Sequence, residues 1–129
     1  MRDRILKEAE FWLDSAKQLF DSESVEREKY TVVGAMTIHA IIRANDAMSM
    51  KLLGKGASRH DEAIALFKQL IEQNKIPSKF ADMRSEILAP AINLKSKVDY
   101  KGEELSKAEA EKWIRNAGIF LKCAKESLS

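Results

Sequence analysis

The stretch from Val25 to Leu53 constrains the fold more than any other part of the chain, because it predicts one long helix that lacks a dominant polar face. Its middle is the least charged segment of the sequence. On a helical wheel at about 100° per residue, its apolar side chains cover two broad arcs. A helix that is apolar on most sides is normally buried against several neighbours. The rest of the chain must therefore supply elements that surround it.

Amphipathic segments on both sides of this stretch can supply those neighbours. From Ile5 to Phe20, apolar side chains recur at spacings of three and four residues, with charged residues on the opposite face. This spacing is typical of an amphipathic helix. Segments that begin near Asp61 and after Ser106 follow the same rule. We therefore predict an all-α fold, an up-and-down helical bundle of four to five helices.

Capping residues indicate where these helices begin and end. Ser58 with Asp61, and Ser106 with Glu109, have the spacing of a capping box, in which each side chain bonds a backbone N–H of the other residue. Gly54 follows the long central helix and can end it, since glycine accepts the left-handed conformation at a helix end. These signals predict helices that begin near residues 58 and 106.

The region between the third and the last predicted helix is less regular. Residues 79–88 predict a short amphipathic helix that Pro90 ends, because proline disrupts a helix interior. In residues 91–102, apolar side chains alternate with polar ones, which predicts an irregular or extended segment. Gly118 lies inside the last helix, where glycine costs about 1 kcal/mol relative to alanine. We therefore expect a close helix crossing at Gly118.

Length and composition predict a single domain over residues 1–129. A chain of 129 residues is long enough to bury a sizeable core. Its 5 glycines and 2 prolines leave little material for the turns of a β-rich fold. We expect Trp12 and Trp113 to pack in that core.

Charge and hydropathy disfavour several broad classes of protein. The net charge of +2 is too small to indicate a nucleic-acid partner by itself. No apolar run approaches the roughly 20 residues that span a bilayer, so we expect no membrane contact. The N-terminal residues lack the apolar core of a secretory signal. Cys123 is the single cysteine and leaves no internal disulfide, which fits an expected cytoplasmic location.

One narrow polar stripe interrupts the central helix. His39, Arg43 and Asp46 fall on it, and helical spacing lets Arg43 reach both of the others. In one interpretation the stripe is a salt-bridge set at the edge of the core or at a dimer seam. In the other it lines a polar cleft that receives an anionic ligand or the backbone of a partner. The residues leave both interpretations open.

A basic turn follows the central helix. It brings Lys51, Lys55, Arg59 and His60 beside the start of the next predicted helix. Free N–H groups and the helix dipole favour an anion at such a position. The turn is therefore either a phosphate-contacting corner or a solvated connection. It is not a P-loop, because its glycines lack that spacing and no strand precedes it.

The sequence carries no recognisable catalytic or metal-binding motif. His39, His60 and Cys123 are its only nitrogen and sulfur ligands of the kind zinc prefers, and their spacing is not clustered. Neither a nucleophile elbow nor an HExxH motif occurs. We therefore expect no metal and no other cofactor.

Two long segments resemble a known family. They are "VVGAMTIHAIIRANDAMSMKLLGKGASRHDEAIALFKQL" and "VDYKGEELSKAEAEKWIRNAGIFLKCAKESL". Together they resemble the HEPN domain (higher eukaryotes and prokaryotes nucleotide-binding), over roughly residues 11–128. The features that carry this resemblance are spaced alanines, a glycine-marked turn, an Asp-Tyr pair and single aromatic or histidine positions. They fall on His39, Ala40, Ala44, Ala47, Leu52, Leu53, Gly54, His60, Leu66, Phe67, Asp99, Tyr100, Ala108, Ala117 and Phe120.

The resemblance implies an up-and-down bundle that often forms a homodimer. Family members cleave RNA, pair with small nucleotidyltransferases in toxin–antitoxin systems, or act as binding modules. The cleaving members resemble one another in an arginine that a histidine follows after four to six residues. This chain departs from that motif, since neither Arg43 nor Arg59 has a histidine at that spacing. Ribonuclease activity is therefore not carried over.

These observations together predict a non-catalytic, HEPN-like binding module. Its partner would be a nucleotide, RNA or a nucleotidyltransferase-type protein, in a toxin–antitoxin or stress system. The alternatives are a divergent, metal-independent ribonuclease that uses His39 and Arg43, and a structural helical interaction protein. We also expect a homodimer that uses portions of the first two helices, because one small bundle can bury only part of the apolar surface of the central helix.

Overall fold

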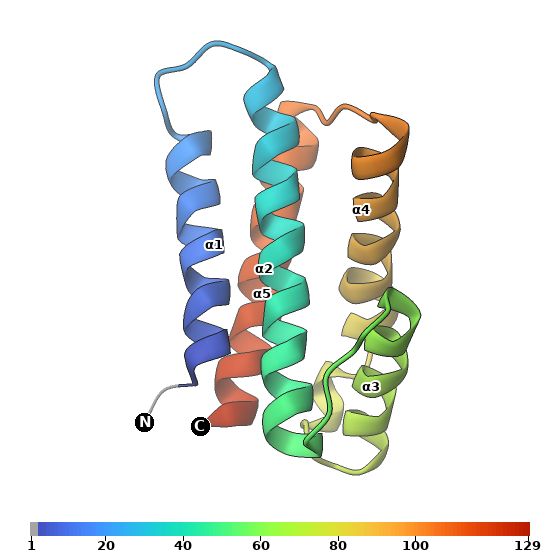
Figure 1. The fold of residues 1–129 in the computed structure, drawn as a ribbon. Helices are drawn as coiled ribbons and strands as arrows, with labels where there is room; N and C mark the ends of the chain where they lie inside the picture. The colour runs from blue at the N-terminus through green and yellow to red at the C-terminus, as the bar shows by residue number, and fades with distance from the viewer. Residues whose placement is uncertain (1–2) are drawn as a thin grey trace.

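Five α-helices make up most of residues 3–129, the part of the chain that the computed structural model describes (Figure 1). They are α1 (Arg4–Phe20), α2 (Glu28–Leu53), α3 (His60–Glu72), α4 (Ala89–Lys101) and α5 (Lys107–Leu128). A short 3-10 helix at Ser78–Phe80 and a π-helical turn at Arg84–Leu88 connect α3 to α4. No β-strand occurs within the described residues. The predicted all-α helical bundle is confirmed.

The long central helix α2 contacts all four other α-helices. Helices α1, α2 and α5 stand side by side, while α3 and α4 lie on the other side of α2 (Figure 1). The chain runs up and down through them, and α1 begins at the same end of the molecule where α5 finishes. The expectation that several neighbours surround α2 is therefore confirmed.

Small side chains hold α1, α2 and α5 close together. Fully buried alanines recur along α1 and α2, and they allow close approach of the helix backbones because they add little bulk between them. Larger residues fill the rest of the core: the rings of Phe67 and Phe120 lie 5.8 Å apart between α3 and α5. Cys123 of α5 is also buried, and burial raises the pKa of its thiol to about 11. The buried alanines of α1 and α2 are Ala9, Ala16, Ala40, Ala44 and Ala47.

The ends of three helices follow local chemistry that the sequence carries. The Asp3 carboxylate accepts a bond from the Leu6 backbone N–H at 3.0 Å and so caps α1. Gly54 ends α2 with a φ of +69°, a backbone conformation that side chains other than glycine rarely adopt. Ser106 and Glu109 bond each other's backbone N–H groups, so the predicted capping box of α5 is confirmed.

The predicted boundaries of α2 and α3 need correction. Helix α2 begins at Glu28 rather than at Val25, because the preceding polar residues form the connection from α1. The predicted box of Ser58 and Asp61 is wrong. Ser58 instead pairs with Glu62, whose carboxylate accepts bonds from the Ser58 N–H at 3.3 Å and from its hydroxyl at 3.0 Å.

The irregular segment predicted for residues 91–102 is also wrong, since these residues lie almost entirely in α4. Pro90 lies in the first turn of α4 and does not end the helix. A first-turn N–H has no partner within the helix, so its absence in proline costs nothing there. The predicted short helix over residues 79–88 is replaced by the 3-10 and π-helical turns.

Two packing predictions fail for identifiable reasons. Gly118 faces open space, so it marks no helix crossing. The close approach is at Gly34, where a Cβ would overlap the Leu105 side chain, while the Leu105 N–H donates to the Thr31 hydroxyl at 3.0 Å. Trp113 is buried as predicted, but 40% of Trp12 is exposed, because α4 does not cover this part of α1 and α2.

None of the helices in the described part of the chain combines the length and the apolar character needed to cross a membrane.

Candidate functional site

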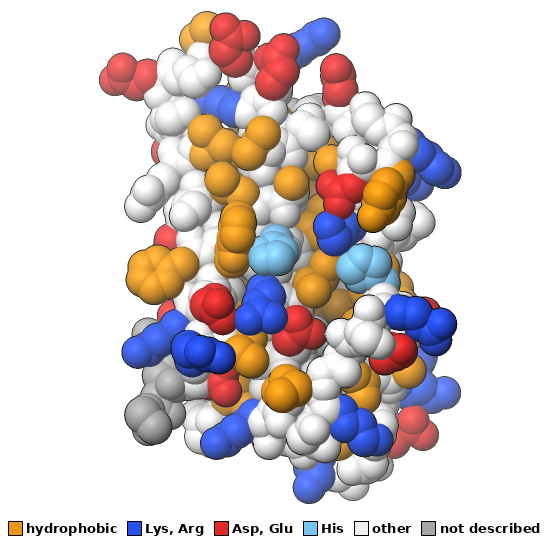
Figure 2. All heavy atoms as spheres, in the orientation of Figure 1, with side chains coloured by type: hydrophobic (Ala, Val, Ile, Leu, Met, Phe, Trp, Pro, Cys, Tyr) orange, Lys and Arg blue, Asp and Glu red, His pale blue; other side chains and the backbone are white. Residues whose placement is uncertain are grey.

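The polar stripe predicted on the central helix lies on the face where α1, α2 and α4 surround an opening. All three of its residues are partly exposed at the edge of this opening: His39, Arg43 and Asp46. In Figure 2, apolar side chains form a column over α1 and α2, and charged side chains of both signs gather around the histidines. We refer to this surface, formed by α1, α2 and α4 around His39, as the open face.

Arg43 is the centre of an ion-pair network on the open face. Its Nη2 donates to the Glu8 carboxylate of α1 at 2.9 Å, and its Nη1 donates to the Asp46 carboxylate at 3.2 Å. The exposed fraction of the Arg43 side chain is 29%. Burial opposes its charge, but the bonds and attraction from Glu8 and Asp46 outweigh it and raise the pKa of Arg43. The guanidinium therefore stays charged and is already matched by two carboxylates.

His39 lies one turn before Arg43 and contacts an aromatic ring of α1. The rings of His39 and Trp12 meet edge to face, with their centroids 4.5 Å apart. Burial lowers the pKa of His39, and the nearby charges of Arg43 and Lys95 lower it further, against the opposite effect of Asp46 and Glu8. His39 is thus neutral at pH 7, and its imidazole can both donate and accept a hydrogen bond.

Asp46 connects the stripe to the start of α3. Burial raises the pKa of its carboxyl group, while Arg43, His39 and His60 act in the opposite direction. Asp46, Arg59 and His60 share the lining of a small pocket of about 300 Å³ at this corner. The structure therefore brings the stripe together with two of the four residues predicted for the basic turn.

The basic turn itself is less suited to an anion than its composition indicates. The Arg59 Nε lies 3.2 Å from a Glu62 oxygen and 3.5 Å from an Asp61 oxygen. Those two acids occupy the first turn of α3, where a bound phosphate would meet their negative charge. Lys51 and Lys55 are exposed and do not line the pocket at this corner.

A groove with apolar walls lies between α2 and α4 on the open face. Its inner part is a pocket of about 300 Å³ that reaches from Trp12 and His39 to the Lys95–Asp99 ion pair of α4, whose charged atoms are 2.6 Å apart. Its outer part is a pocket of about 290 Å³ near the start of α2. The two pockets share Val32 and Val98 and so lie next to each other along α2; we call the pair of them the α2–α4 groove.

Sequence reasoning missed four residues of this site. The apolar periodicity of residues 5–20 predicts a core position for Trp12 and a place on the solvated face for Glu8. Lys95 and Asp99 fell in a segment predicted to be irregular. Their i, i+4 spacing is a helical signal, because oppositely charged side chains at that distance face each other on a helix. The Lys95–Asp99 spacing therefore indicates a helix over this segment, although its alternating apolar residues do not.

The stripe offers a proton acceptor, but its one cation is already paired with carboxylates. The neutral His39 imidazole could accept a proton, but Arg43, the nearest cation of α2, is held between two carboxylates. A transition state with developing negative charge needs a cation or N–H donors aimed at it. No group of three or more histidine, cysteine or acidic side chains suited to a metal ion occurs within residues 3–129.

Comparison with known proteins gives no assignment. No protein-family model matches the chain, and no curated protein matches it either. The function must therefore be argued from the open face and the α2–α4 groove.

Proposed function

We propose that this chain is a non-catalytic, HEPN-like binding module whose ligand is another protein, docked on the open face. The observation that carries the proposal is the α2–α4 groove, whose apolar walls reach the surface beside the half-exposed Trp12. Exposed aromatic and apolar side chains beside a groove are typical of protein interaction surfaces.

The charges on the open face support a protein over RNA or a nucleotide. Both arginines of the predicted anion sites, Arg43 and Arg59, are paired with carboxylates. Binding to a phosphate backbone depends on cations that are free to neutralise it. A protein partner instead needs apolar contacts surrounded by polar groups that can bond across the interface.

The resemblance to the HEPN domain gives the partner class that we propose first. Its binding members pair with small nucleotidyltransferases, so a nucleotidyltransferase-type protein in a toxin–antitoxin or stress system is the partner that this resemblance implies. The departure from the Arg–His cleavage motif supports a binding role for the chain, and the alternative ribonuclease with His39 and Arg43 has no further support on the open face.

Copurification from native cells tests this proposal. A tagged wild-type chain should retain a specific protein that Trp12→Ser releases and that ribonuclease treatment leaves bound. Ile119→Ser is the matched control, because Ile119 is 49% exposed on α5 and does not line the α2–α4 groove. Bound RNA or nucleotide without a protein would contradict the proposal. Absence of any ligand would leave the structural interaction protein as the better interpretation.

We also propose that the module forms a homodimer through portions of α1 and α2. Phe11 of α1 is 72% exposed, which is unusual for so large an apolar side chain and suits an anchor between two copies. Light scattering at micromolar concentration should give the mass of two chains for the wild type and of one chain for Phe11→Ser. A wild-type monomer at that concentration would rule the homodimer out.

A further inference from the structure

We infer that the α2–α4 groove takes an amphipathic helix of the partner, with the basic end of that helix at the N-terminal end of α2. This inference rests on the proposed function, since it names the part of a protein partner that the open face would bind. It depends on three features of the groove: its shape, its apolar wall and the charge at its outer end.

The shape of the groove suits a helix. Its walls are two helices that run in opposite directions, α2 and α4 (Figure 1). Along α2 it extends from Glu28 to His39, which are twelve residues and a rise of about 16 Å, or three turns of a helix. A third helix that lies along two others buries its apolar stripe between them, as in the recognition of amphipathic helices by grooves.

The wall of the groove presents apolar side chains at helical spacing. Val32 and Met36 lie one turn apart on α2, Val98 faces them from α4, and Trp12 closes the inner end. Val32 is 45% exposed and Trp12 40% exposed, so a partner would remove substantial apolar surface from water. Apolar residues at i, i+3, i+4 and i+7 of the incoming helix would contact this row.

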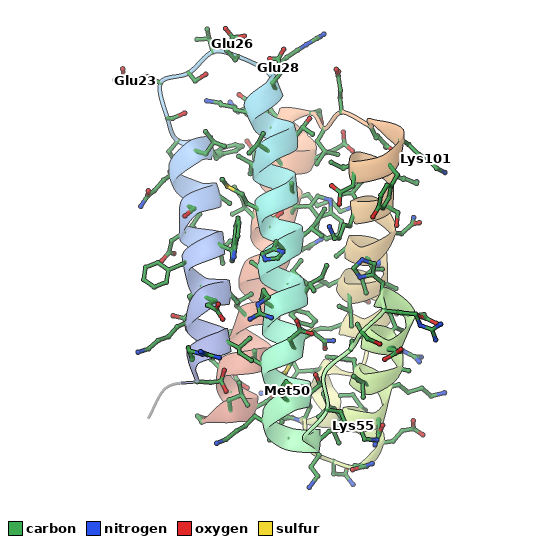
Figure 3. The ribbon with its side chains drawn as sticks, viewed as in Figure 1. Glu23, Glu26, Glu28, Met50, Lys55 and Lys101 are labelled. Carbon is green, nitrogen blue, oxygen red and sulfur yellow. The ribbon has the colours of Figure 1, made fainter. Side chains whose placement is uncertain are left out.

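The outer end of the groove is acidic. Its lining contains three carboxylates and one cation, so the acidic groups outnumber the basic one. They are Glu28, Glu103, Glu104 and Arg27. Figure 3 shows Glu28 at the start of α2, with Glu23 and Glu26 on the neighbouring connection. Lysine or arginine at the matching end of the incoming helix would complement this charge and set its direction. The inner end, with its Lys95–Asp99 pair, is internally neutral.

Two designed peptides test the inference on the intact chain. Both are helical, of about 16 residues, with leucines at i, i+3, i+4 and i+7; one carries lysines at one end and the other carries glutamates there. Fluorescence anisotropy measures their binding to the wild type. We expect the lysine peptide to bind at micromolar concentration, at least about tenfold more tightly than the glutamate peptide. Equal affinity, or no binding below about 1 mM, would overturn the inference.

Matched variants locate the peptide. Val32→Glu should weaken the lysine peptide by about tenfold or more, whereas Val25→Glu should not, because Val25 is 94% exposed and lies outside the groove. Circular dichroism confirms that both variants fold. The double variant Glu103→Gln, Glu104→Gln should remove the preference for the lysine peptide, while Glu72→Gln with Glu111→Gln should preserve it. Unchanged binding by Val32→Glu would place the peptide elsewhere and reject the groove.

The outcomes separate this inference from the proposed function. A native protein partner that binds the wild type, survives Val32→Glu and is not displaced by the lysine peptide would overturn the groove and leave the binding module standing. A native ligand that proves to be RNA or a nucleotide would overturn the proposed function, whatever the peptides do.

Discussion

The two sides of α2 are built differently. On one side, α1 and α5 pack closely against it through buried alanines. On the other side, α4 follows a 3-10 and a π-helical turn, and the α2–α4 groove stays open beside it. The comparison shows that α2 is not enclosed equally all round: α1 and α5 cover its alanine-rich side, and part of its surface beside α4 stays exposed in the groove.

The largest expected contrast comes from deleting one ring in the core and one ring on the exposed surface of α4. Phe120→Ala should lower the free energy of unfolding by about 3–5 kcal/mol, because Phe120 is fully buried and leaves a cavity. Tyr100→Ala should change it by less than about 0.5 kcal/mol, since Tyr100 of α4 is 85% exposed. Urea unfolding measures both. Similar decreases in the free energy of unfolding for the two variants would contradict this difference in packing.

Enlarging an alanine tests the same comparison within one helix. Ala40→Leu should cost about 1–3 kcal/mol, because Ala40 is completely buried on the closely packed side and the extra methylenes have no space. Ala35→Leu should stay within about 0.5 kcal/mol, because Ala35 is exposed and lines the groove. Thermal melts compare the pair. A tolerated Ala40→Leu would mean that α1 and α5 hold α2 less closely than the structure indicates.

The ion pairs of the open face should contribute less than either core change. Arg43→Ala should cost about 1 kcal/mol, since Arg43 and both of its carboxylate partners are partly exposed. Arg59→Ala, which removes a 72% exposed side chain of the basic turn, is the control and should change stability by less than about 0.5 kcal/mol. A loss of about 3–5 kcal/mol for Arg43→Ala would instead indicate a buried structural network.

We expect His39 to cause a small dependence of the stability of the fold on pH. Its pKa lies below the ordinary value of 6.5, so the unfolded chain binds a proton more readily than the native one, and stability falls as pH drops through 6.5. The groups that face it are Glu8 of α1, Arg43 and Asp46 of α2, and Lys95 of α4. Melting temperatures at about pH 7.5 and 5.5 span this window.

The matched variants for this effect are the two histidine substitutions. His39→Gln should lose much of the decrease in melting temperature on acidification, whereas His60→Gln should keep it. Asp46 acts in the opposite direction at lower pH, because its raised pKa lets the native state bind a proton first. A decrease that survives in His39→Gln would assign the pH dependence to other groups.

The sequence predicts the two sides of α2 unequally well. Helices α1 and α5 show clear amphipathic periodicity, and α2 is a long, mostly apolar stretch that Gly54 ends, so the existence of all three helices follows from local pattern. Helix α4 does not, because only one stripe of it touches the core and its groove wall mixes apolar with polar residues. Pro90 misled the prediction because its effect depends on whether it stands in the first turn or in the interior.

The candidate site shows the same limit. The stripe of His39, Arg43 and Asp46 follows from helical spacing within α2 alone. The partners from other helices, Glu8 and Trp12, depend on how α1 rotates against α2, and spacing within one segment carries no information on that angle. The α2–α4 groove depends on what α4 leaves uncovered, so it appears only once the helices are placed together.

The buried Cys123 allows the opening of α5 to be measured as a rate. It is the single cysteine of the chain, it is buried in α5, and burial raises the pKa of its thiol to about 11. A thiol reagent attacks the thiolate, so it must wait until α5 separates from its neighbours. The rate of labelling therefore reports how often α5 separates from the elements packed against it. Trp12 of α1 is 40% exposed on the open face, so its fluorescence, measured in a Trp113→Phe variant, follows changes on that face instead.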